Sequence, residues 1–217
     1  MLLVKIGANG LKKERKFMTK NLLLIFTRNP ELGKAKTRLA KTVGDETALE
    51  IYKFLLKKTN EISSKVNADK AVYYSVKVRE NDIWDASIYQ KHLQKGEDLG
   101  IRMLNAFNHG FDEGYKKIII IGSDLYDLTP NHIEQAFSYL DSNNVVIGPA
   151  KDGGYYLLGL TKLHEQIFKN KDWGTSSVRK DTLKDLKENT IHLLEELNDI
   201  DVFEDIKDHK AFQHFLK

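Results

Sequence analysis

The stretch that decides the fold is Asn21–Thr27, which has the sequence NLLLIFT. It is a short and continuous apolar run, typical of a β-strand that is buried on both faces of its sheet. A second run of this kind, KIIIIG at Lys117–Gly122, follows much later in the chain. Sheets with such strands are covered by helices on both sides. The two runs therefore predict an α/β domain.

Helical and strand patterns alternate around these two runs. Apolar residues at helical spacing predict helices, and runs rich in β-branched and aromatic residues predict strands. We expect helices at Asp45–Ser64, Glu97–Glu113, Asn131–Leu140, Leu163–Phe168, Ser176–Asp185 and Asp205–Leu216. We expect further strands at Lys70–Val76, Ser87–Lys91, Asn144–Ile147, Gly154–Gly159 and Thr190–Leu194. The alternation predicts one domain over residues 21–217, with a mostly parallel, twisted sheet and helices on both faces.

The composition is that of a folded domain. The chain has 217 residues, of which 41% are apolar and 30% are charged, which argues against a disordered or fibrous protein. It has no cysteine, which excludes disulfides, thiolate zinc sites and a cysteine nucleophile. No stretch approaches the roughly 20 apolar residues of a membrane span. We expect a cytoplasmic protein without a membrane span.

The positive charge of the chain is concentrated at its beginning. Six Lys and Arg against one Glu give residues 1–20 a net charge of +5, so the rest of the chain carries −2 out of a total of +3. Met18 stands just before the first strong strand. We therefore expect residues 1–20 to be a basic, loosely ordered extension or the product of an upstream start. A nucleic-acid partner is not expected, because the basic patch typical of such proteins is otherwise confined to one loop.

That loop follows the first strand. Arg28–Leu39 has the sequence RNPELGKAKTRL, and in open α/β sheets ligands bind at the carboxyl ends of strands, where this loop begins. Guanidinium groups bind phosphate bidentately, ammonium groups act as point charges, and a glycine lets backbone N–H groups approach. The candidate phosphate ligands are Arg28, Gly33, Lys34, Lys36 and Arg38. The alternative is a solvated basic loop, and the spacing is not that of a Walker P-loop.

An acidic group follows the second buried run. Ser123 and Asp124 come directly after Gly122, so the Asp124 carboxylate is held at the end of a rigid strand. Mg²⁺ is typically bound by one or two carboxylates together with substrate phosphates. Because parallel strands end at one edge of the sheet, Asp124 is expected to face the basic loop. The alternative is an ordinary turn carboxylate.

Five segments together resemble a known family. They are FTRNPELGKAKTRL at Phe26–Leu39, QKGEDLGIRMLNAF at Gln94–Phe107, GSDLYDLT at Gly122–Thr129, GPAKDGGYYLLGL at Gly148–Leu160 and WGTSSVRKDTL at Trp173–Leu183. In this order they resemble the bacterial glycosyltransferase-A-like transferases associated with radical-SAM and selenodomain proteins. They are also similar to molybdenum-cofactor and 2-phospholactate guanylyltransferases. Two residues depart from the family pattern: Arg28 replaces a lysine, and Tyr126 replaces a proline.

The resemblance implies a single-domain GT-A fold, a nucleotide or nucleotide-sugar donor, and Mg²⁺ or Mn²⁺. Asp124 matches the strand-end aspartate of the family and is the first candidate metal ligand. The segment NDIDVFEDI at Asn198–Ile206 resembles the closing acidic segment of the family, so Asp199 or Asp201 is the candidate second ligand. The alternative is a solvated acidic turn.

Further residues are candidates for binding the nucleotide and the acceptor. Gln94, Asp98 and Arg102 are four residues apart and are expected on one face at a helix start, facing a base or ribose; capping and a salt bridge are the alternative. The candidate acceptor ligands are Asp152, Gly153, Gly154, Tyr155, Trp173 and Thr175. Here the alternatives are a bulged hairpin with buried tyrosines and an ordinary buried tryptophan.

The hypothesis is an in-line transfer of a glycosyl or nucleotidyl group to a small acceptor. The candidate catalytic residues are Asp124, Lys36 and Arg38, with Ser123 beside the phosphates. In glycosyl transfer a nucleoside diphosphate leaves, whereas a guanylyltransferase-type reaction releases pyrophosphate. An alternative of another class is a nucleotide-binding regulatory domain without catalysis. The sequence leaves the oligomeric state open.

Overall fold

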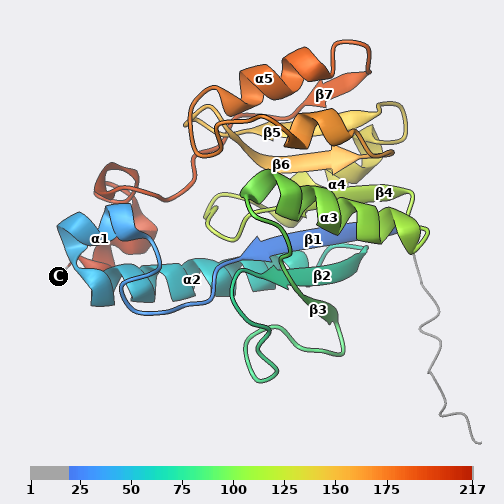
Figure 1. Ribbon diagram of the computed structural model, residues 1–217. Coiled ribbons are helices and arrows are strands. Elements are labelled where there is room, and N and C mark those ends of the chain that lie inside the picture. Colours follow the sequence, from blue (N-terminus) through green and yellow to red (C-terminus); the bar gives the residue numbers. More distant parts are fainter. Residues whose placement is uncertain (1–19, 217) are drawn as a thin grey trace, which may run out of the picture.

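The computed structural model describes residues 20–216, and within this range seven strands form one sheet (Figure 1). The expected extension at residues 1–20 therefore lies, except for Lys20, outside the described residues. The order across the sheet is β3-β2-β1-β4-β6-β5-β7. The strands are β1 (Asn21–Thr27), β2 (Asp69–Tyr74), β3 (Tyr89–Leu93), β4 (Lys117–Ile121), β5 (Val145–Pro149), β6 (Tyr155–Leu160) and β7 (Ile191–Leu193).

The sheet is mostly parallel, as predicted. Strand β1 pairs in parallel with β2 on one side and with β4 on the other. Only β6 runs antiparallel to its neighbours, β4 and β5. In the register of β1 and β4, Ile25 lies opposite Ile121. The loops that leave these two central strands therefore begin side by side at one edge of the sheet.

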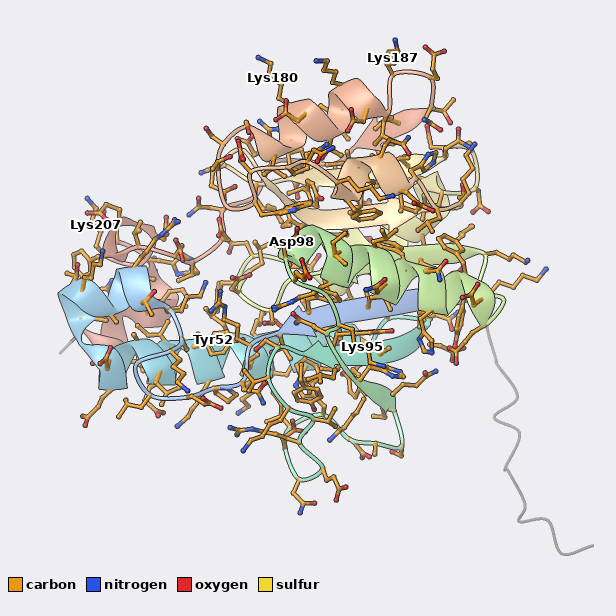
Figure 2. All side chains as sticks on the ribbon, in the orientation of Figure 1. Tyr52, Lys95, Asp98, Lys180, Lys187 and Lys207 are labelled. Carbon is orange, nitrogen blue, oxygen red and sulfur yellow. The ribbon has the colours of Figure 1, made fainter. Side chains whose placement is uncertain are left out.

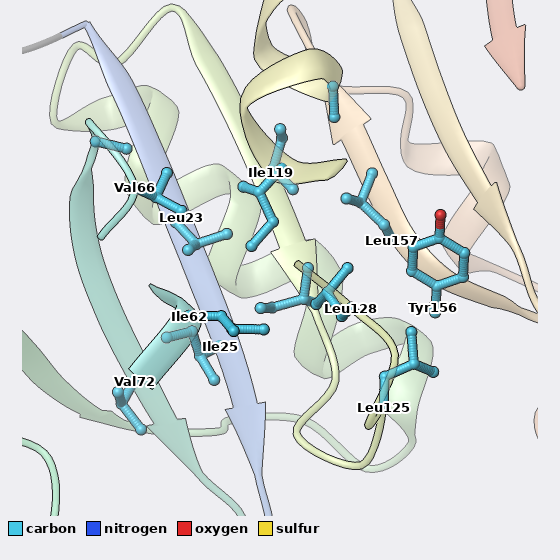
Figure 3. Packing of buried hydrophobic residues seen from close by; sticks show 14 of the residues in the cluster. Leu23, Ile25, Ile62, Val66, Val72, Ile119, Leu125, Leu128, Tyr156 and Leu157 are labelled. Atoms are coloured by element: carbon cyan, nitrogen blue, oxygen red, sulfur yellow. The ribbon is translucent and has the colours of Figure 1, made fainter. Parts of the chain in front are cut away.

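Helices cover both faces of the sheet (Figure 1). The α-helices are α1 (Thr37–Val43), α2 (Asp45–Ser63), α3 (Leu99–Asp112), α4 (Pro130–Tyr139) and α5 (Val178–Asp185). The 3₁₀ helices are η1 (Glu165–Phe168), η2 (Phe203–Asp205) and η3 (Lys210–Phe215). The core against α2 and α4 includes Leu23, Ile25, Val72 and Ile119 (Figure 3). The opposite core packs β-strand residues against α3 and η1. Alternate residues of β1 thus enter different cores, which is why its sequence is continuously apolar.

Several predicted elements differ from the structure. The predicted helix at Asp205–Leu216 is wrong, because this segment contains only the 3₁₀ helices η2 and η3. Its residues Ile206 and Phe212 pack onto α1 and α2 as a third, separate core. The predicted helix at Leu163–Phe168 is also only a 3₁₀ helix. Helix α1 was not predicted, because its short sequence lies within the basic segment.

We call residues 198–216 the C-terminal arm. In Figure 1 the arm returns from β7 to lie beside α1 and α2. Exposed lysines such as Lys180, Lys187 and Lys207 project from separate parts of the surface (Figure 2). Within residues 20–216, no helix combines the length and apolar character that crossing a bilayer requires.

Candidate active site

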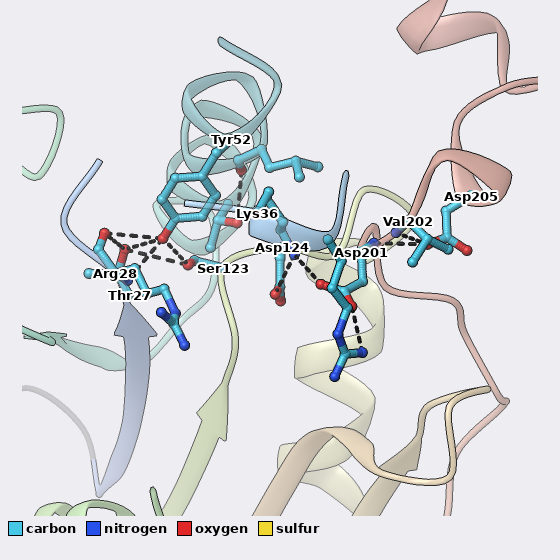
Figure 4. A network of polar contacts seen from close by, with 12 residues as sticks. Thr27, Arg28, Lys36, Tyr52, Ser123, Asp124, Asp201, Val202 and Asp205 are labelled. Atoms are coloured by element: carbon cyan, nitrogen blue, oxygen red, sulfur yellow. Dashed lines mark hydrogen bonds and ion pairs between the residues drawn. The ribbon is translucent and has the colours of Figure 1, made fainter. Parts of the chain in front are cut away.

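The candidate site begins where β1 and β4 end. A buried hydroxyl network joins the two strand ends: the Tyr52 hydroxyl from α2 lies 3.2 Å from both Thr27 Oγ1 and Ser123 Oγ (Figure 4). The same hydroxyl accepts a hydrogen bond from the Arg28 N–H at 2.9 Å. Burial raises the pKa of Tyr52, so it remains a neutral phenol that can both donate and accept. The network fixes Ser123, and with it the backbone that carries Asp124.

A second anchor holds the beginning of the basic loop. The Asn29 side chain is buried and accepts hydrogen bonds from the N–H groups of Val76 and Lys77, at 3.0 and 3.3 Å. Its amide donates to the Lys77 carbonyl at 2.8 Å. One side chain therefore takes up backbone groups of Val76 and Lys77, so the segment after β2 bonds to the Asn29 side chain. We did not single out Asn29 or Tyr52 from the sequence.

Lys36 is the central cation of the site. Its side chain is 6% exposed, and its Nζ donates to Asp124 Oδ2 at 2.9 Å. Its backbone is left-handed, with φ 50°, in a region that residues other than glycine rarely adopt. Backbone strain of this kind is often found at functional sites. The turn before α1 thus directs a buried ammonium group at the carboxylate that follows β4.

The charges around Lys36 keep it protonated. Burial by itself favours the neutral amine, but the carboxylates of Asp124, Asp201 and Asp199 outweigh it, and the net effect is a raised pKa of Lys36. The Asp201 carboxylate lies 4.0 Å from the same ammonium group. The site therefore holds a fixed positive charge surrounded by acidic groups.

The C-terminal arm supplies these additional carboxylates. The Ile200 N–H donates to the Asp124 carbonyl at 3.1 Å, which ties the arm to the loop after β4. The Asp205 side chain accepts from the N–H groups of Asp201 and Val202, both at 2.8 Å (Figure 4). Arg38, in α1, donates to Asp201 at 2.9 Å. The arm is thus fixed both to α1 and to the strand end.

Asp199 has the most perturbed carboxyl group of the site. Burial, together with the negative charges of Asp124 and Asp152, raises its pKa to about 6, although Lys36 opposes the shift. Three carboxylates therefore influence one another at this edge of the sheet. A cation that approached Asp199 would relieve this repulsion.

The metal ligands expected from the sequence lie near one another but do not form a complete coordination site. In the described part of the chain, no three His, Asp or Glu side chains converge closely enough to hold an ion by themselves. Lys36 lies between Asp124 and Asp201, and Asp201 is also paired with Arg38. Asp124 and Asp199 are therefore better placed than Asp201 for binding a metal.

A cavity of about 250 Å³ opens beside Asp124. Its walls come from the ends of β1 and β4, the start of α3, the loop before β6 and the segment before α5. It contains most of the predicted acceptor ligands, and it joins them to two of the predicted metal ligands. These residues are Asp124, Asp152, Gly154, Tyr155, Trp173, Thr175 and Asp199.

The turn before β6 is fixed by local contacts. Asp152 accepts from the Gly154 N–H at 2.8 Å. Gly153 has φ +91°, and a Cβ on it would lie 2.4 Å from the Ser176 carbonyl oxygen. The Arg179 N–H donates to the Gly153 carbonyl at 3.0 Å. The turn and the start of α5 therefore form one rigid wall of the cavity, in agreement with the tight bend expected here.

The two aromatic candidates have different environments. The Tyr155 hydroxyl is buried without a hydrogen-bond partner among the described residues, and burial raises its pKa. Its ring borders the cavity. Trp173 is half-buried against the core on the α3 face. A Cβ on Gly100, at the start of α3, would lie 2.6 Å from the indole; Gly100 is thus a further residue on which the wall depends, and it was not singled out as a site residue from the sequence.

The structure does not gather all four cations of the basic loop. Lys34 is 73% exposed and pairs with Glu31 at 3.0 Å on the surface. Arg28 is exposed and borders a different hollow, beside Arg79 and Trp84. Of the four, only Lys36 and Arg38 contact the acidic side chains of the site.

The prediction that Gln94, Asp98 and Arg102 share one helix face is wrong, because α3 begins only at Leu99. The Gln94 amide donates to the Thr27 carbonyl at 3.2 Å and to the Tyr73 carbonyl at 2.9 Å, so it bridges strand ends. Asp98 caps α3 by accepting from Ile101 N–H, and Arg102 donates to the Gly96 carbonyl. These contacts match the capping alternative, without the salt bridge.

The sequence and the fold are similar to those of known bacterial proteins. Residues 58–175 match the family described as "Uncharacterized protein conserved in bacteria (DUF2064)". No curated protein matches the chain. One similar crystal structure is that of a candidate nucleotide-diphospho-sugar transferase from Desulfovibrio desulfuricans G20. It is 27% identical with a TM-score of 0.79, and the match covers 92% of this chain and 94% of the other.

Two more distant structures share the fold. One is Rv0371c from Mycobacterium tuberculosis H37Rv in complex with manganese, 11% identical with a TM-score of 0.57, over 87% of this chain and 97% of the other. Another is CMP:2-keto-3-deoxy-manno-octonic acid synthetase complexed with CTP. It is 10% identical with a TM-score of 0.53, and the match covers 92% of this chain and 100% of the other. The chain therefore has the α/β fold of nucleotide-diphospho-sugar transferases.

Proposed function

The chain belongs to the bacterial family DUF2064, and we propose that it is a divalent-metal-dependent transferase that moves a glycosyl group from a nucleotide-activated donor to a small acceptor. The observation that carries the proposal is the Lys36–Asp124 ion pair at the carboxyl ends of the two central strands. Asp124 of this pair lines a cavity large enough for a small molecule. The similarity to the candidate sugar transferase from Desulfovibrio supports the same class of donor.

The residues present fit a magnesium or manganese ion. Mg²⁺ needs only one or two protein carboxylates when substrate phosphates complete its shell. Asp124 and Asp199 would provide them, since each lines the cavity and their mutual repulsion favours a cation. When bound, the ion would neutralise charge on the departing nucleoside diphosphate. The manganese complex of Rv0371c supports a divalent metal in this fold.

The basic residues would bind the donor phosphates. Lys36 is buried and permanently charged, so a phosphate oxygen can take the place that Asp124 occupies in the ion pair. Arg38 is 65% exposed, and its planar guanidinium suits bidentate binding of a second phosphate. Positioning and electrostatic stabilisation would then supply most of the catalysis, and the acceptor would supply the nucleophile.

A second candidate is nucleotidyl transfer with release of pyrophosphate, as in guanylyltransferases. The fold shared with a synthetase that binds CTP supports it. Glycosyl transfer is favoured because only two of the four loop cations contact the acidic side chains of the site, Lys36 through Asp124 and Arg38 through Asp201. Two cations and one metal suit a nucleoside diphosphate better than the greater charge of a triphosphate.

The substitution Asp124→Asn tests the proposal. We expect it to lower nucleotide release from the donor by about 100-fold or more, because an amide cannot replace a charged metal ligand. The assay would screen nucleotide sugars and nucleoside triphosphates with Mg²⁺ or Mn²⁺, first by thermal stabilisation and then by release of diphosphate or pyrophosphate. Stabilisation by triphosphates alone would reject glycosyl transfer.

The matched control is Asp127→Asn in the same loop. The Asp127 carboxylate is 54% exposed and lies 3.7 Å from His209, on the arm, so its loss should leave turnover unchanged. Equal activity of the two variants would reject the metal mechanism. A chain that binds a donor but never turns it over would instead support a regulatory nucleotide-binding domain.

A further inference from the structure

The cavity beside Asp124 has mostly apolar walls. Its apolar and aromatic lining includes Phe26, Met103, Leu125, Leu128, Tyr156 and Trp173, of which Leu125, Leu128 and Tyr156 are seen together in Figure 3. Leu99, in the first turn of α3, also lines the cavity and is 43% exposed. Apolar surface that water reaches inside a concave site is stabilised when a ligand covers it.

The charged groups of the cavity are all of one sign. Asp124, Asp152 and Asp199 lie on its wall, whereas no lysine, arginine or histidine lines it within residues 20–216. The cations that contact lining residues already have carboxylate partners: Lys36 binds Asp124, and Arg179, which donates to the Ala150 carbonyl, binds Glu196. The cavity thus offers negative charge and apolar surface, and among the described residues its lining offers no cationic side chain to an anion.

We infer that the acceptor is an uncharged or cationic molecule with an apolar or aromatic body, and that it reacts through a hydroxyl group. Its body would lie between Leu99, Trp173 and Tyr156, and its hydroxyl would point at the carboxylates. This inference rests on the proposed function, since it assigns the cavity to the acceptor of that reaction. It argues against acceptors that carry a phosphate or carboxylate group, because no cationic side chain lines the cavity within residues 20–216 and Asp152 keeps its negative charge when Asp124 and Asp199 hold the metal.

With such an acceptor, the bond that forms in the transfer is matched by the bond that breaks. The acceptor oxygen forms a bond to the sugar carbon, while the bond from that carbon to the phosphate oxygen of the donor breaks. The electron pair of the broken bond leaves with the nucleoside diphosphate. The proton of the hydroxyl passes to Asp152, the lining carboxylate that is not assigned to the metal, and then to water. An acidic cavity is suited to this step, because a carboxylate accepts the proton.

Three ligands with the same body test the inference: phenylbutanol, phenylbutylamine and phenylbutanoate. Binding to the full chain is measured by ligand-observed NMR in EDTA, so that no metal recruits the carboxylate. We expect the alcohol and the amine to bind at least about 10-fold more tightly than the carboxylate. Equal or tighter binding of phenylbutanoate overturns the inference, and so does a failure of all three ligands to bind.

A substitution at Leu99 gives a second readout. Leu99→Lys places a cation on the cavity wall and should favour phenylbutanoate over phenylbutanol. The matched control is Leu193→Lys on β7, because Leu193 is 48% exposed and is not among the residues lining the cavity. The same change in preference in both variants overturns the inference.

The two proposals fail in different ways. If a donor is turned over but the carboxylate ligand binds as well as the alcohol, only the acceptor class is wrong. If no donor is bound or turned over while the alcohol is still preferred, the cavity has the inferred preference and the proposed function is wrong.

Discussion

Two features of Lys36 are each unfavourable for the free energy of folding. Its backbone occupies the left-handed region, and its ammonium group is buried. The buried charge is balanced by carboxylates, since the Nζ contacts Asp124 and Asp201. In the proposed reaction the same group exchanges Asp124 for a donor phosphate, so that the metal and the ammonium group compete for Asp124 until the donor binds.

The substitution Lys36→Met tests this competition. The methionine keeps an unbranched side chain of similar length and removes the charge. Without nucleotide, we expect Mn²⁺ to bind about 5-fold more tightly, corresponding to about 1 kcal/mol for a partly exposed ion pair. Turnover of the donor should nevertheless fall, because a phosphate ligand is lost. Titration calorimetry and nucleotide release measure the two effects.

Lys34→Met is the control for Lys36→Met. Lys34 lies two residues earlier in the same loop, but its ammonium group is paired with Glu31 on the surface. Neither metal affinity nor turnover should change in this variant. Unchanged Mn²⁺ affinity in Lys36→Met would show that Lys36 and the metal do not compete.

At the residue scale, the sequence identified groups that carry charge at strand ends. Lys36 and Asp124 were singled out because each follows a strongly apolar strand. Asn29 and Tyr52 were missed because they act through backbone groups and buried hydroxyls. Tyr52 lies on the apolar face of α2 and there has the spacing of an ordinary core residue. Contacts between residues distant in sequence leave no local pattern.

Among the elements, the turn at Asp152–Gly154 contributes most to the shape of the cavity. It carries one carboxylate of the site and connects β5 to β6 across the wall formed by Ser176 and Arg179. Gly153 is required in this turn for two reasons: its φ is positive, and the backbone of Ser176 lies close to it.

The substitution Gly153→Ala tests this element. A Cβ would lie 2.4 Å from the Ser176 carbonyl oxygen and 2.6 Å from its Cα, so the two segments must separate. We expect a loss of about 2 kcal/mol or more in the free energy of unfolding, from left-handed strain together with the clash. Binding of phenylbutanol should weaken as well, because the wall moves. Denaturant titration and ligand-observed NMR measure the two effects.

The substitution Gly114→Ala separates the effect of backbone strain from the effect of a steric clash. Gly114 has φ +93°, and a Cβ on it would meet nothing within 4 Å, so only the backbone strain of about 1 kcal/mol should appear. If the two variants are equally stable, the contact with Ser176 does not matter.

The elements themselves were predictable to different degrees. The buried strands and the long helix α2 were found, because long or strongly apolar patterns are specific. Helix α1 has seven residues and begins at Thr37, after a left-handed Lys36 that makes no side-chain cap hydrogen bond, so it lacks the usual N-cap signal. The segment Asp205–Leu216 has apolar residues near helical spacing, but packing against α1 and α2 holds it in 3₁₀ turns.

In the whole molecule, the site depends on contact between the two ends of the domain. Arg38 and Asp201 are separated by 163 positions, yet they meet beside Asp124. The arm is held there by a core of its own, in which Phe212 is fully buried with Leu39 and Ile51. The geometry of Asp199 therefore depends on packing far from the cavity.

The substitution Phe212→Ala tests this dependence. We expect it to lower the free energy of unfolding by about 3–5 kcal/mol, as for other buried aromatic residues. It should also weaken Mn²⁺ binding, because the arm that carries Asp199 detaches more easily. Denaturant titration and titration calorimetry measure the two effects.

Phe137→Ala is the comparison. Phe137 is a buried residue of α4 in a core that does not include the arm, so the variant should lose similar stability and keep its affinity for Mn²⁺. Equal affinities in the two variants would mean that the arm does not hold a metal ligand. The sequence predicted an acidic segment here, but not its docking on α1 and α2, because that contact joins the first and last elements.

The hydrogen bond from Ile200 to the Asp124 carbonyl has a consequence for protein synthesis. During translation the central strands and Asp124 leave the ribosome first, and Asp199 follows after roughly 4–15 s at usual elongation rates. In this interval β5, β6 and β7 are still being made, so a nascent domain has β1 to β4 and Asp124 but lacks Asp199. Under the proposed function such a chain lacks one metal ligand, so we expect substrate binding to require that the last-made segment docks against the first helices.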